Sequence, residues 1–241
     1  NYINYNLQLT PLAKNAKQFL YNLLTRTNTG RSFADKIVNK SFKDSASYWE
    51  NRYRKNGNSG NGSYGKNADY KATILNHFVE ENNISSVIEL GCGDGNQLKQ
   101  FRLPSYTGLD VSETAIRKCI KIFENDFSKR FLLYDEDVFV NHKDSLIAEL
   151  GLSLDVMYHL VEDKVFETYM HRLFSVSSRY VIIYAWDVEE GRKYHVRHRK
   201  FTEWIARYFP SFQLLKIIKS NPKDGYCDFF IYKKIQPIPT S

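Results

Sequence analysis

The chain has 241 residues, of which 42% are hydrophobic and 25% are charged, and its formal net charge is +7. This composition excludes wholesale disorder, suits one domain with additions, and suggests an anionic partner without identifying it. Three scattered cysteines exclude a disulfide framework and a zinc site, so we expect no metal and a reducing, cytoplasmic compartment.

The N-terminal quarter has a helical pattern followed by a glycine-rich segment. Residues 7–43 carry apolar residues at helical spacing, and residues 57–65 are rich in Gly, Asn and Ser between aromatic flanks. The glycine-rich segment is either a flexible linker or a lid that keeps water from a site. We divide the chain into a helical extension with this lid, residues 1–66, and a second domain, residues 67–241. We expect no transmembrane segment, because no apolar run reaches the ~20 residues that span a bilayer. Since the chain starts at Asn1 without methionine, a lost N-terminal signal stays open.

Strand-like and helical runs alternate through the second domain. We expect strands at residues 86–90, 106–109, 130–134, 150–154 and 179–186, and helices at 68–81, 96–101, 113–125, 144–149, 163–176 and 201–209. Two further strands, 212–218 and 226–235, are joined by a turn-rich segment. This order predicts an α/β fold with a doubly wound, mostly parallel, seven-stranded sheet and a C-terminal antiparallel hairpin.

A glycine-rich turn follows the first strand in the stretch SSVIELGCGDGNQL. Gly91, Gly93 and Gly95 lack side chains and would let the backbone approach a ligand closely. The pattern differs from the G-x-G-x-x-G of dinucleotide-binding proteins. Glu89 and Asp94 would repel a pyrophosphate, whereas they suit a cofactor that carries an ammonium and a sulfonium. The alternative is that the glycines only make a tight turn.

An acidic residue ends the second strand in YTGLDVS. Asp110 follows Gly91 by about 20 positions, which is the usual place for a carboxylate that binds ribose hydroxyls. NAD and S-adenosylmethionine share this feature, so it indicates a nucleoside and not a particular one. Asp110 could instead cap the next helix, but Ser112 is the more natural N-cap.

Four motifs in order, VIELGCGDGNQL, YTGLDVS, FLLYDEDVF and LSLDVMYHLVED, resemble those of the class I S-adenosylmethionine-dependent methyltransferases. The resemblance covers residues 68–186 well and implies a Rossmann-like fold, S-adenosylmethionine as cofactor and S-adenosylhomocysteine as product. It implies that Asp110 binds the ribose and that Val111, Asp137 and Val138 lie near the adenine; Asp135 is an alternative to Asp137. The cofactor loop would comprise Glu89, Gly91, Cys92, Gly93, Gly95 and Asn96, although Cys92 can also be a small packed residue.

The acceptor side follows the fourth strand. In methyltransferases that resemble this chain, residues after that strand lie beside the methyl group, which makes Asp155, Tyr158 and His159 the candidates. We expect His159 and Asp155 to be catalytic and Tyr158 and Tyr64 to contact the acceptor. His159 has the chemistry of a general base, or it packs against the cofactor.

A basic stretch, RKYHVRHRKFTEW, lies between the fifth strand and the next helix. Arg197, His198 and Arg199 could bind a phosphate or carboxylate of the acceptor, or the stretch could be a solvated face.

The function we expect is O-methylation of a sugar, glycan or other small acceptor, which could be phosphorylated or lipid-linked. The wording of YWENRY, GNSGNGSYG and HVRHRKF also resembles bacterial methyltransferases of surface-polysaccharide biosynthesis. A nucleic-acid methyltransferase is the alternative, and it is disfavoured because no recognised RNA-binding module and no N/D-P-P-Y/F motif is present. A third possibility is a catalytically silent module that only binds the cofactor.

Overall fold

The structure is a computed structural model that describes residues 42–135, 145–191, 194–220 and 227–235. The chain divides into two compact units, Asn1–Lys43 and Asp44–Ser241. The first unit lies almost wholly outside the described residues, so the helical pattern of residues 7–43 stays a prediction. The functional division of the chain after residue 66 also stays a prediction.

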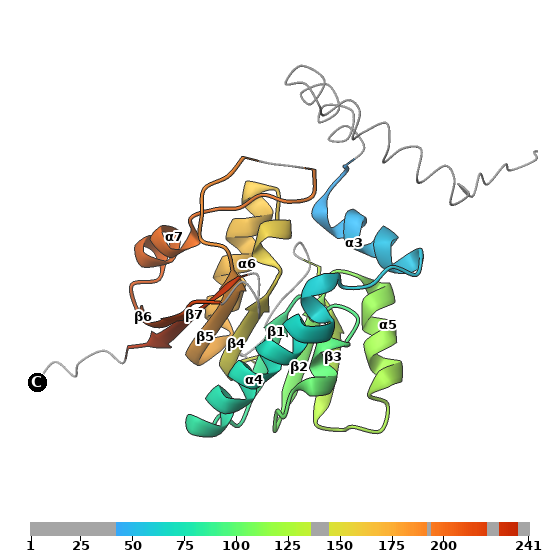
Figure 1. The fold of residues 1–241 in the computed structure, drawn as a ribbon, viewed down its shortest axis with the longest axis horizontal. Coiled ribbons are helices and arrows are strands. Elements are labelled where there is room, and N and C mark those ends of the chain that lie inside the picture. Colours follow the sequence, from blue (N-terminus) through green and yellow to red (C-terminus); the bar gives the residue numbers. More distant parts are fainter. Residues whose placement is uncertain (1–41, 136–144, 192–193, 221–226, 236–241) are drawn as a thin grey trace, which may run out of the picture. The chain divides into compact units, whose positions relative to one another are not determined.

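One mixed sheet forms the centre of the second unit (Figure 1), with seven strands in the order β3-β2-β1-β4-β5-β7-β6. The strands are β1 (Val87–Leu90), β2 (Tyr106–Asp110), β3 (Lys129–Leu133), β4 (Ala148–Leu154), β5 (Ser177–Ala185), β6 (Phe212–Ile218) and β7 (Asp228–Lys234). Strands β1 to β5 pair in parallel, whereas β7 runs antiparallel to both β5 and β6. This arrangement confirms the predicted doubly wound sheet with its C-terminal antiparallel hairpin.

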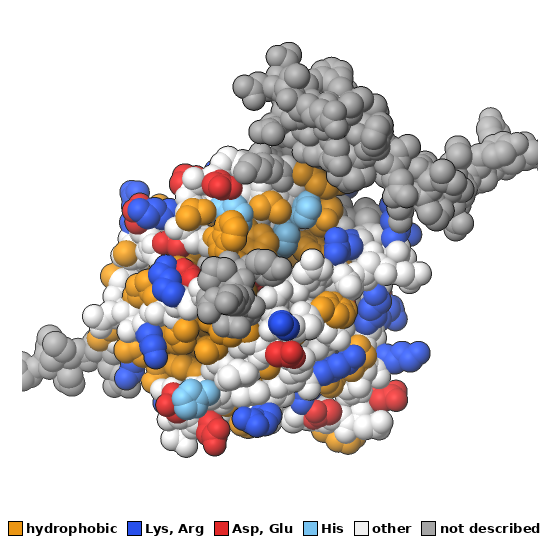
Figure 2. All heavy atoms as spheres, in the orientation of Figure 1, with side chains coloured by type: hydrophobic (Ala, Val, Ile, Leu, Met, Phe, Trp, Pro, Cys, Tyr) orange, Lys and Arg blue, Asp and Glu red, His pale blue; other side chains and the backbone are white. Residues whose placement is uncertain are grey.

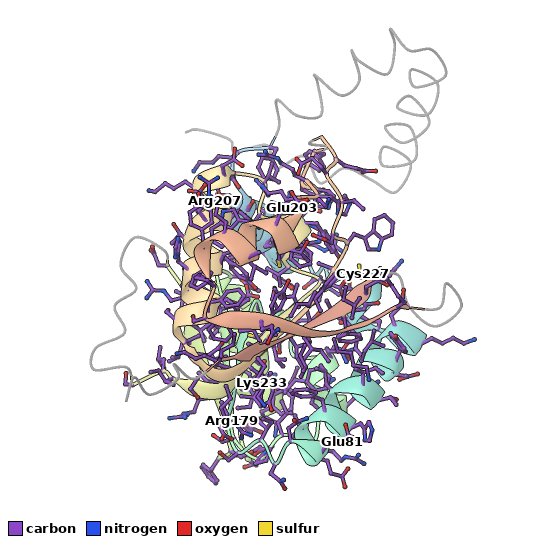
Figure 3. All side chains as sticks on the ribbon, turned by 90° about the vertical axis from the view of Figure 1, so that its left-hand side faces the viewer. Glu81, Arg179, Glu203, Arg207, Cys227 and Lys233 are labelled. Atoms are coloured by element: carbon purple, nitrogen blue, oxygen red, sulfur yellow. The ribbon has the colours of Figure 1, made fainter. Side chains whose placement is uncertain are left out.

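Helices cover both faces of the sheet. They are α3 (Ser45–Arg54), α4 (Gly65–Glu81), α5 (Glu113–Ile122), α6 (Asp163–Ser175) and α7 (Phe201–Tyr208). Successive residues of β5 alternate between two buried clusters: Ile182 packs with α4 and α5, and Ile183 packs with α6 and α7. Figure 3 looks onto the β6 side of the sheet, with α7 and α4 at its two faces. Because both faces are covered, every residue of β1 is buried.

The structure differs from the predicted elements in three places. The helix expected over residues 144–149 is wrong: residue 144 lies outside the described residues, and Ala148 already belongs to β4, where it pairs with Ser177 of β5. Sheet pairing overrides the weak helical pattern there. The run at residues 96–101 is only a short 3₁₀ helix, η2 (Gln97–Gln100), and α3 was not predicted at all.

The helices in the described part of the chain are too short or too polar to cross a membrane.

Candidate active site

The ends of β1, β2 and β4 meet around a cavity of about 370 Å³, which we call the first cavity. Carboxyl ends of parallel strands share one edge of a sheet, and ligands of such folds bind there. The wall includes these predicted residues: Glu89, Gly91, Cys92, Gly93, Asp110, Val111, Asp155 and His159. The predicted Gly95 and Asn96 lie in the same loop but do not line the cavity, and Asp137 and Val138 fall outside the described residues. Asp135, the alternative acid, lines the wall.

Asp110 is buried and holds the loop after β1. Its Oδ2 accepts a hydrogen bond from the Gly93 amide at 2.9 Å, and its Oδ1 accepts one from the Ser112 amide at 2.9 Å. Burial raises the pKa of the Asp110 carboxyl to about 6. A carboxylate offers about four acceptor positions, so capacity remains for ribose hydroxyls. Ser112 itself caps α5, because its hydroxyl accepts from the Ala115 amide, and Asp110 is therefore not the cap.

Glu89 is buried at the floor of the first cavity. The Tyr106 hydroxyl donates to its Oε2 at 2.6 Å, and burial raises the pKa of the Glu89 carboxyl to about 7. The buried carboxyl groups of Glu89 and Asp110, neither of which forms an ion pair among the described residues, make this cavity favourable for a cationic ligand.

The glycine-rich segment packs on the loop after β1 through hydrogen bonds, unlike a flexible linker. Asp94 accepts hydrogen bonds from the Ser59 hydroxyl at 2.8 Å and the Tyr64 hydroxyl at 2.8 Å. The Asn96 side chain donates to the Ser63 carbonyl at 2.8 Å. Tyr64, expected at the acceptor, therefore contacts Asp94 and lines neither cavity described in this subsection.

The surroundings of Gly93 explain why this position of the loop has no side chain. Its φ angle is +61°, and a Cβ there would come within 2.4 Å of the Ser59 hydroxyl and 3.1 Å of the Tyr53 hydroxyl. The backbone without a side chain therefore leaves room for the glycine-rich segment, a neighbour that the sequence motif alone does not reveal.

Helix α3 spans the mouth of the first cavity. At its first residue the Ser45 amide donates to Glu162 at 3.1 Å, and near the middle of the helix Glu50 accepts from the hydroxyls of Ser112 and Thr114. These bonds connect α3 to the beginnings of α6 and α5. The sequence does hold a signal for this helix, because Asp44 is an N-cap whose Oδ1 accepts from the Ser47 amide.

A second cavity, of about 380 Å³, adjoins the first. Trp49, Ser59, Asp155 and His159 line both cavities. The rest of the second wall is mostly aromatic or backbone, and includes Gly60, Gly62, Tyr158, Trp186, His195 and His198. Histidine and hydrophobic side chains gather on the upper part of the face drawn in Figure 2. Lys and Arg side chains are scattered among acidic residues over the whole of this face.

His159 is held as a neutral imidazole. Its Nδ1 lies 3.1 Å from the His195 carbonyl, which can only accept, so Nδ1 carries the hydrogen and Nε2 has the lone pair. The ring is parallel to His195 at 5.3 Å and edge-on to Trp49 at 4.9 Å. Burial lowers the pKa of His159 to about 4.

Arg197 and Arg199 are engaged within the protein. Both form ion pairs with Asp163, at 2.8 Å and 3.1 Å, and Arg199 also donates to the carbonyls of Leu160 and Val161. Neither lines either cavity, whereas His198 from the same stretch lines the second. Their role in acceptor binding stays a prediction.

Lys71 and Gln97 are among the site residues that the sequence did not predict. Lys71 is fully buried, and its Nζ lies 2.6 Å from Asp155 Oδ2. Gln97 lines the first cavity, donates to the Ala68 carbonyl, and has a buried Oε1 for which the described residues provide no partner. A signal existed for Lys71, since it shares the buried stripe of α4 with Ala68 and Leu75.

No group of three His, Cys, Asp or Glu among the described residues is arranged to hold a metal ion.

Comparisons with known proteins identify the fold. Neither a protein-family model nor a curated protein sequence matches the chain. N-methyltransferase NodS from Bradyrhizobium japonicum WM9, crystallised with S-adenosyl-L-homocysteine, is 13% identical with a TM-score of 0.62, covering 80% of this chain and 100% of its own. Magnesium protoporphyrin IX methyltransferase from Synechocystis PCC 6803 with bound S-adenosylmethionine is 14% identical with a TM-score of 0.59, covering 80% and 99%. The methyltransferase domain of bacterial CtHen1-C is 15% identical with a TM-score of 0.56, covering 71% and 100%.

These likenesses confirm the Rossmann-like methyltransferase fold that the sequence predicts. The predicted cofactor agrees with the ligands present in two of these structures. Surface-polysaccharide biosynthesis is not among the names of these three proteins, and this finer resemblance stays a prediction.

Proposed function

We propose that this chain transfers the methyl group of S-adenosylmethionine to a hydroxyl of a small acceptor, a sugar or related glycan unit. The observation that carries the proposal is the meeting of two cavities at the carboxyl edge of the sheet. A donor in the first cavity and an acceptor in the second would face each other across Trp49, Ser59, Asp155 and His159.

The first cavity fits the cofactor. Asp110 would accept from the ribose hydroxyls, and Val111 would pack on the adenine beside Asp135. The unpartnered Oε1 of Gln97 suits the ammonium of the methionine part, since a buried acceptor without a donor is costly. When bound, the cofactor supplies a methyl group on a sulfonium, whose positive charge the carboxylates of this cavity favour.

The shared wall would align the acceptor and receive its proton. His159 is neutral at pH 7, and its Nε2 carries the lone pair. As the acceptor oxygen is methylated, its proton would pass to Nε2 of His159. The electrons of the bond between the sulfur and the methyl carbon would stay on the sulfur of the product, S-adenosylhomocysteine. The depressed pKa makes this imidazole a weak base, so positioning of the two reactants supplies much of the rate enhancement. Proximity and orientation can lower the activation barrier by roughly 7–11 kcal/mol.

Asp155 would orient the acceptor. It has a φ of +60°, which is uncommon for a residue with a side chain, and its carboxylate is fixed from two sides by Lys71 and by the Tyr158 hydroxyl at 2.9 Å. A carboxylate held in this way can accept a hydrogen bond from a second hydroxyl of the acceptor.

The aromatic wall of the second cavity supports a small ring as acceptor. Trp186 and His198 stack at 5.3 Å, and Tyr158 lies beside His198 at 5.4 Å, which gives flat apolar surfaces of the kind that contact sugar or aromatic rings. The scattered Lys and Arg side chains on the face in Figure 2 do not favour a nucleic-acid acceptor.

The test is cofactor binding by calorimetry, followed by formation of S-adenosylhomocysteine with phosphorylated sugars, non-phosphorylated sugars and RNA. We expect binding, and turnover with a sugar. Asp110→Asn should weaken cofactor binding at least tenfold, because hydrogen bonds to a charged group contribute roughly 1.5–3 kcal/mol each. The matched control is Asp69→Asn, an exposed residue of α4. Equal cofactor affinity in Asp110→Asn and wild type would contradict the ribose assignment, and turnover with RNA alone would contradict the acceptor class.

A further inference from the structure

One arginine of the second cavity differs from the other arginines around it. Arg52, in the last turn of α3, lines this cavity and is half-buried. In the part of the chain that the structure describes, no carboxylate forms an ion pair with Arg52. Arg197 and Arg199, in contrast, share Asp163. A guanidinium in a cavity without an acidic partner is suited to bind an anionic ligand.

The side chain of Arg52 is held in place by neutral groups. Its Nε donates to the Asn58 carbonyl at 2.6 Å, and Nη2 lies 3.4 Å from the Asn58 side-chain oxygen. Its guanidinium carbon lies 5.5 Å from the centre of the Trp49 ring. A side-chain hydrogen bond with Tyr48 adds a further neutral partner, so no described carboxylate compensates the +1 charge, and a guanidinium has five N–H donors, more than Asn58 and Tyr48 use.

The rest of the second cavity supports an anion. Asp155 is the one carboxylate among the described residues that line it, and it forms an ion pair with Lys71 at 2.6 Å. His195 lines the same cavity, and its buried Nδ1 has no hydrogen-bond partner among the described residues. An anionic group that reached Arg52 would thus meet a second polar nitrogen and, among the described lining residues, no carboxylate without a cationic partner.

We propose that Arg52 is the anion-binding residue of the acceptor site, and that the acceptor is a small molecule carrying a phosphate, such as a sugar phosphate. This inference rests on the proposed function, and it moves the predicted anion site from Arg197 and Arg199 to α3. The ring would lie on the aromatic wall, and the phosphate would lie at the guanidinium, which can bind two of its oxygens at once. The specificity for a phosphorylated acceptor then resides in α3.

The test measures binding of glucose 1-phosphate, inorganic phosphate and methyl glucoside by calorimetry, with S-adenosylhomocysteine present. We expect both phosphates to bind wild type, glucose 1-phosphate more tightly. Arg52→Gln should weaken both at least tenfold, and Arg52→Lys should recover only part of the loss, because an ammonium lacks the bidentate fork. The matched control is Arg54→Gln, two residues along the same helix and exposed, which should bind as wild type does.

Four outcomes would overturn the inference. They are no phosphate binding by wild type, unchanged binding in Arg52→Gln, a loss confined to Arg197→Gln or Arg199→Gln, and tighter binding of a short single-stranded RNA through the same arginine. Cofactor affinity is measured on every variant and should not change. A wild type that binds phosphate but not S-adenosylmethionine would refute the proposed function while leaving an anion site at Arg52.

Discussion

The two cavities that meet at the carboxyl edge of the sheet are built in different ways. In the first, the residues predicted to bind the cofactor lie mainly in short stretches at the ends of β1 and β2, where Gly93 and Asp110 are joined by a hydrogen bond of 2.9 Å, and more distant elements such as α3 complete the wall. The second is made by residues from distant parts of the chain, which lie within 49–62, 155–159 and 195–198, together with Trp186 and Cys227. A contiguous motif therefore supplies the predicted cofactor contacts of the first cavity, whereas the second cavity depends on tertiary packing throughout.

This difference predicts how variants of the two cavities should behave. Changes in the first cavity should alter cofactor affinity, and changes in the second should alter turnover or acceptor binding with cofactor affinity intact. Only variants of the shared wall should be able to change both cofactor affinity and turnover.

The largest expected effect is at His159 on the shared wall. His159→Ala should lower kcat about 10²–10⁴-fold if Nε2 takes the proton of a hydroxyl, because that is the usual contribution of a general base. Steady-state kinetics with the acceptor found by the panel measures this effect, and cofactor affinity should stay unchanged. His77→Ala, at an exposed histidine on α4, is the control. An unchanged kcat would mean that the transfer proceeds by positioning alone.

Sequence reasoning reached the two sides of this site unequally. Gly93 and Asp110 could be predicted because their chemistry lies in a contiguous motif. The partner that occupies the space beside Gly93 could not, since Ser59 is brought there by a segment whose composition also suits a linker. For Arg199 the sequence leaves an anion ligand and a solvated face open, because a basic run shows charge but does not reveal the partner, Asp163, 36 positions away.

Helices show the same limit. The α3 helix is short and its Asp44 cap is a weak signal beside a glycine-rich segment. The apparent helix over residues 144–149 failed because pairing of Ala148 with β5 is a long-range contact that local propensity does not contain. Lys71 was overlooked because a lysine is normally exposed, yet its place on the buried stripe of α4 required a partner.

The second effect concerns stability and comes from the buried pair Lys71–Asp155. Lys71→Met or Asp155→Asn alone should reduce the free energy of unfolding by about 3–5 kcal/mol, since each leaves a buried charge without its partner. The double variant should recover most of the loss, because no charge remains buried. Chemical denaturation of the four proteins measures this cycle.

Turnover then separates structure from function in the same four proteins. The double variant should stay impaired in acceptor turnover, because the carboxylate that orients the acceptor is gone. Recovery of both stability and turnover would show that the pair serves only the fold.

A smaller effect tests what surrounds Gly93. Gly93→Ala places a methyl group at the Ser59 hydroxyl, which would displace the glycine-rich segment. We therefore expect cofactor affinity to fall about tenfold, or about 1.4 kcal/mol. Gly93→Ala combined with Ser59→Gly should bind the cofactor as Ser59→Gly alone does, because the contact is relieved. If the double variant is as weak as Gly93→Ala, the methyl group conflicts with the ligand itself or with the backbone conformation at φ +61°.

The smallest expected effect decides between two roles for the basic stretch after β5. Arg199→Gln removes bonds to Asp163 and to the carbonyls of Leu160 and Val161, and we expect the free energy of unfolding to fall by about 1 kcal/mol. In a domain of this size that lowers Tm by about 2–4 °C. KM for the acceptor should stay close to the wild-type value, because Arg199 does not line the second cavity. Calorimetry and steady-state kinetics on the same preparation separate the two roles: a raised KM with an unchanged Tm would return the anion site to Arg199 and remove the reason for placing it on α3.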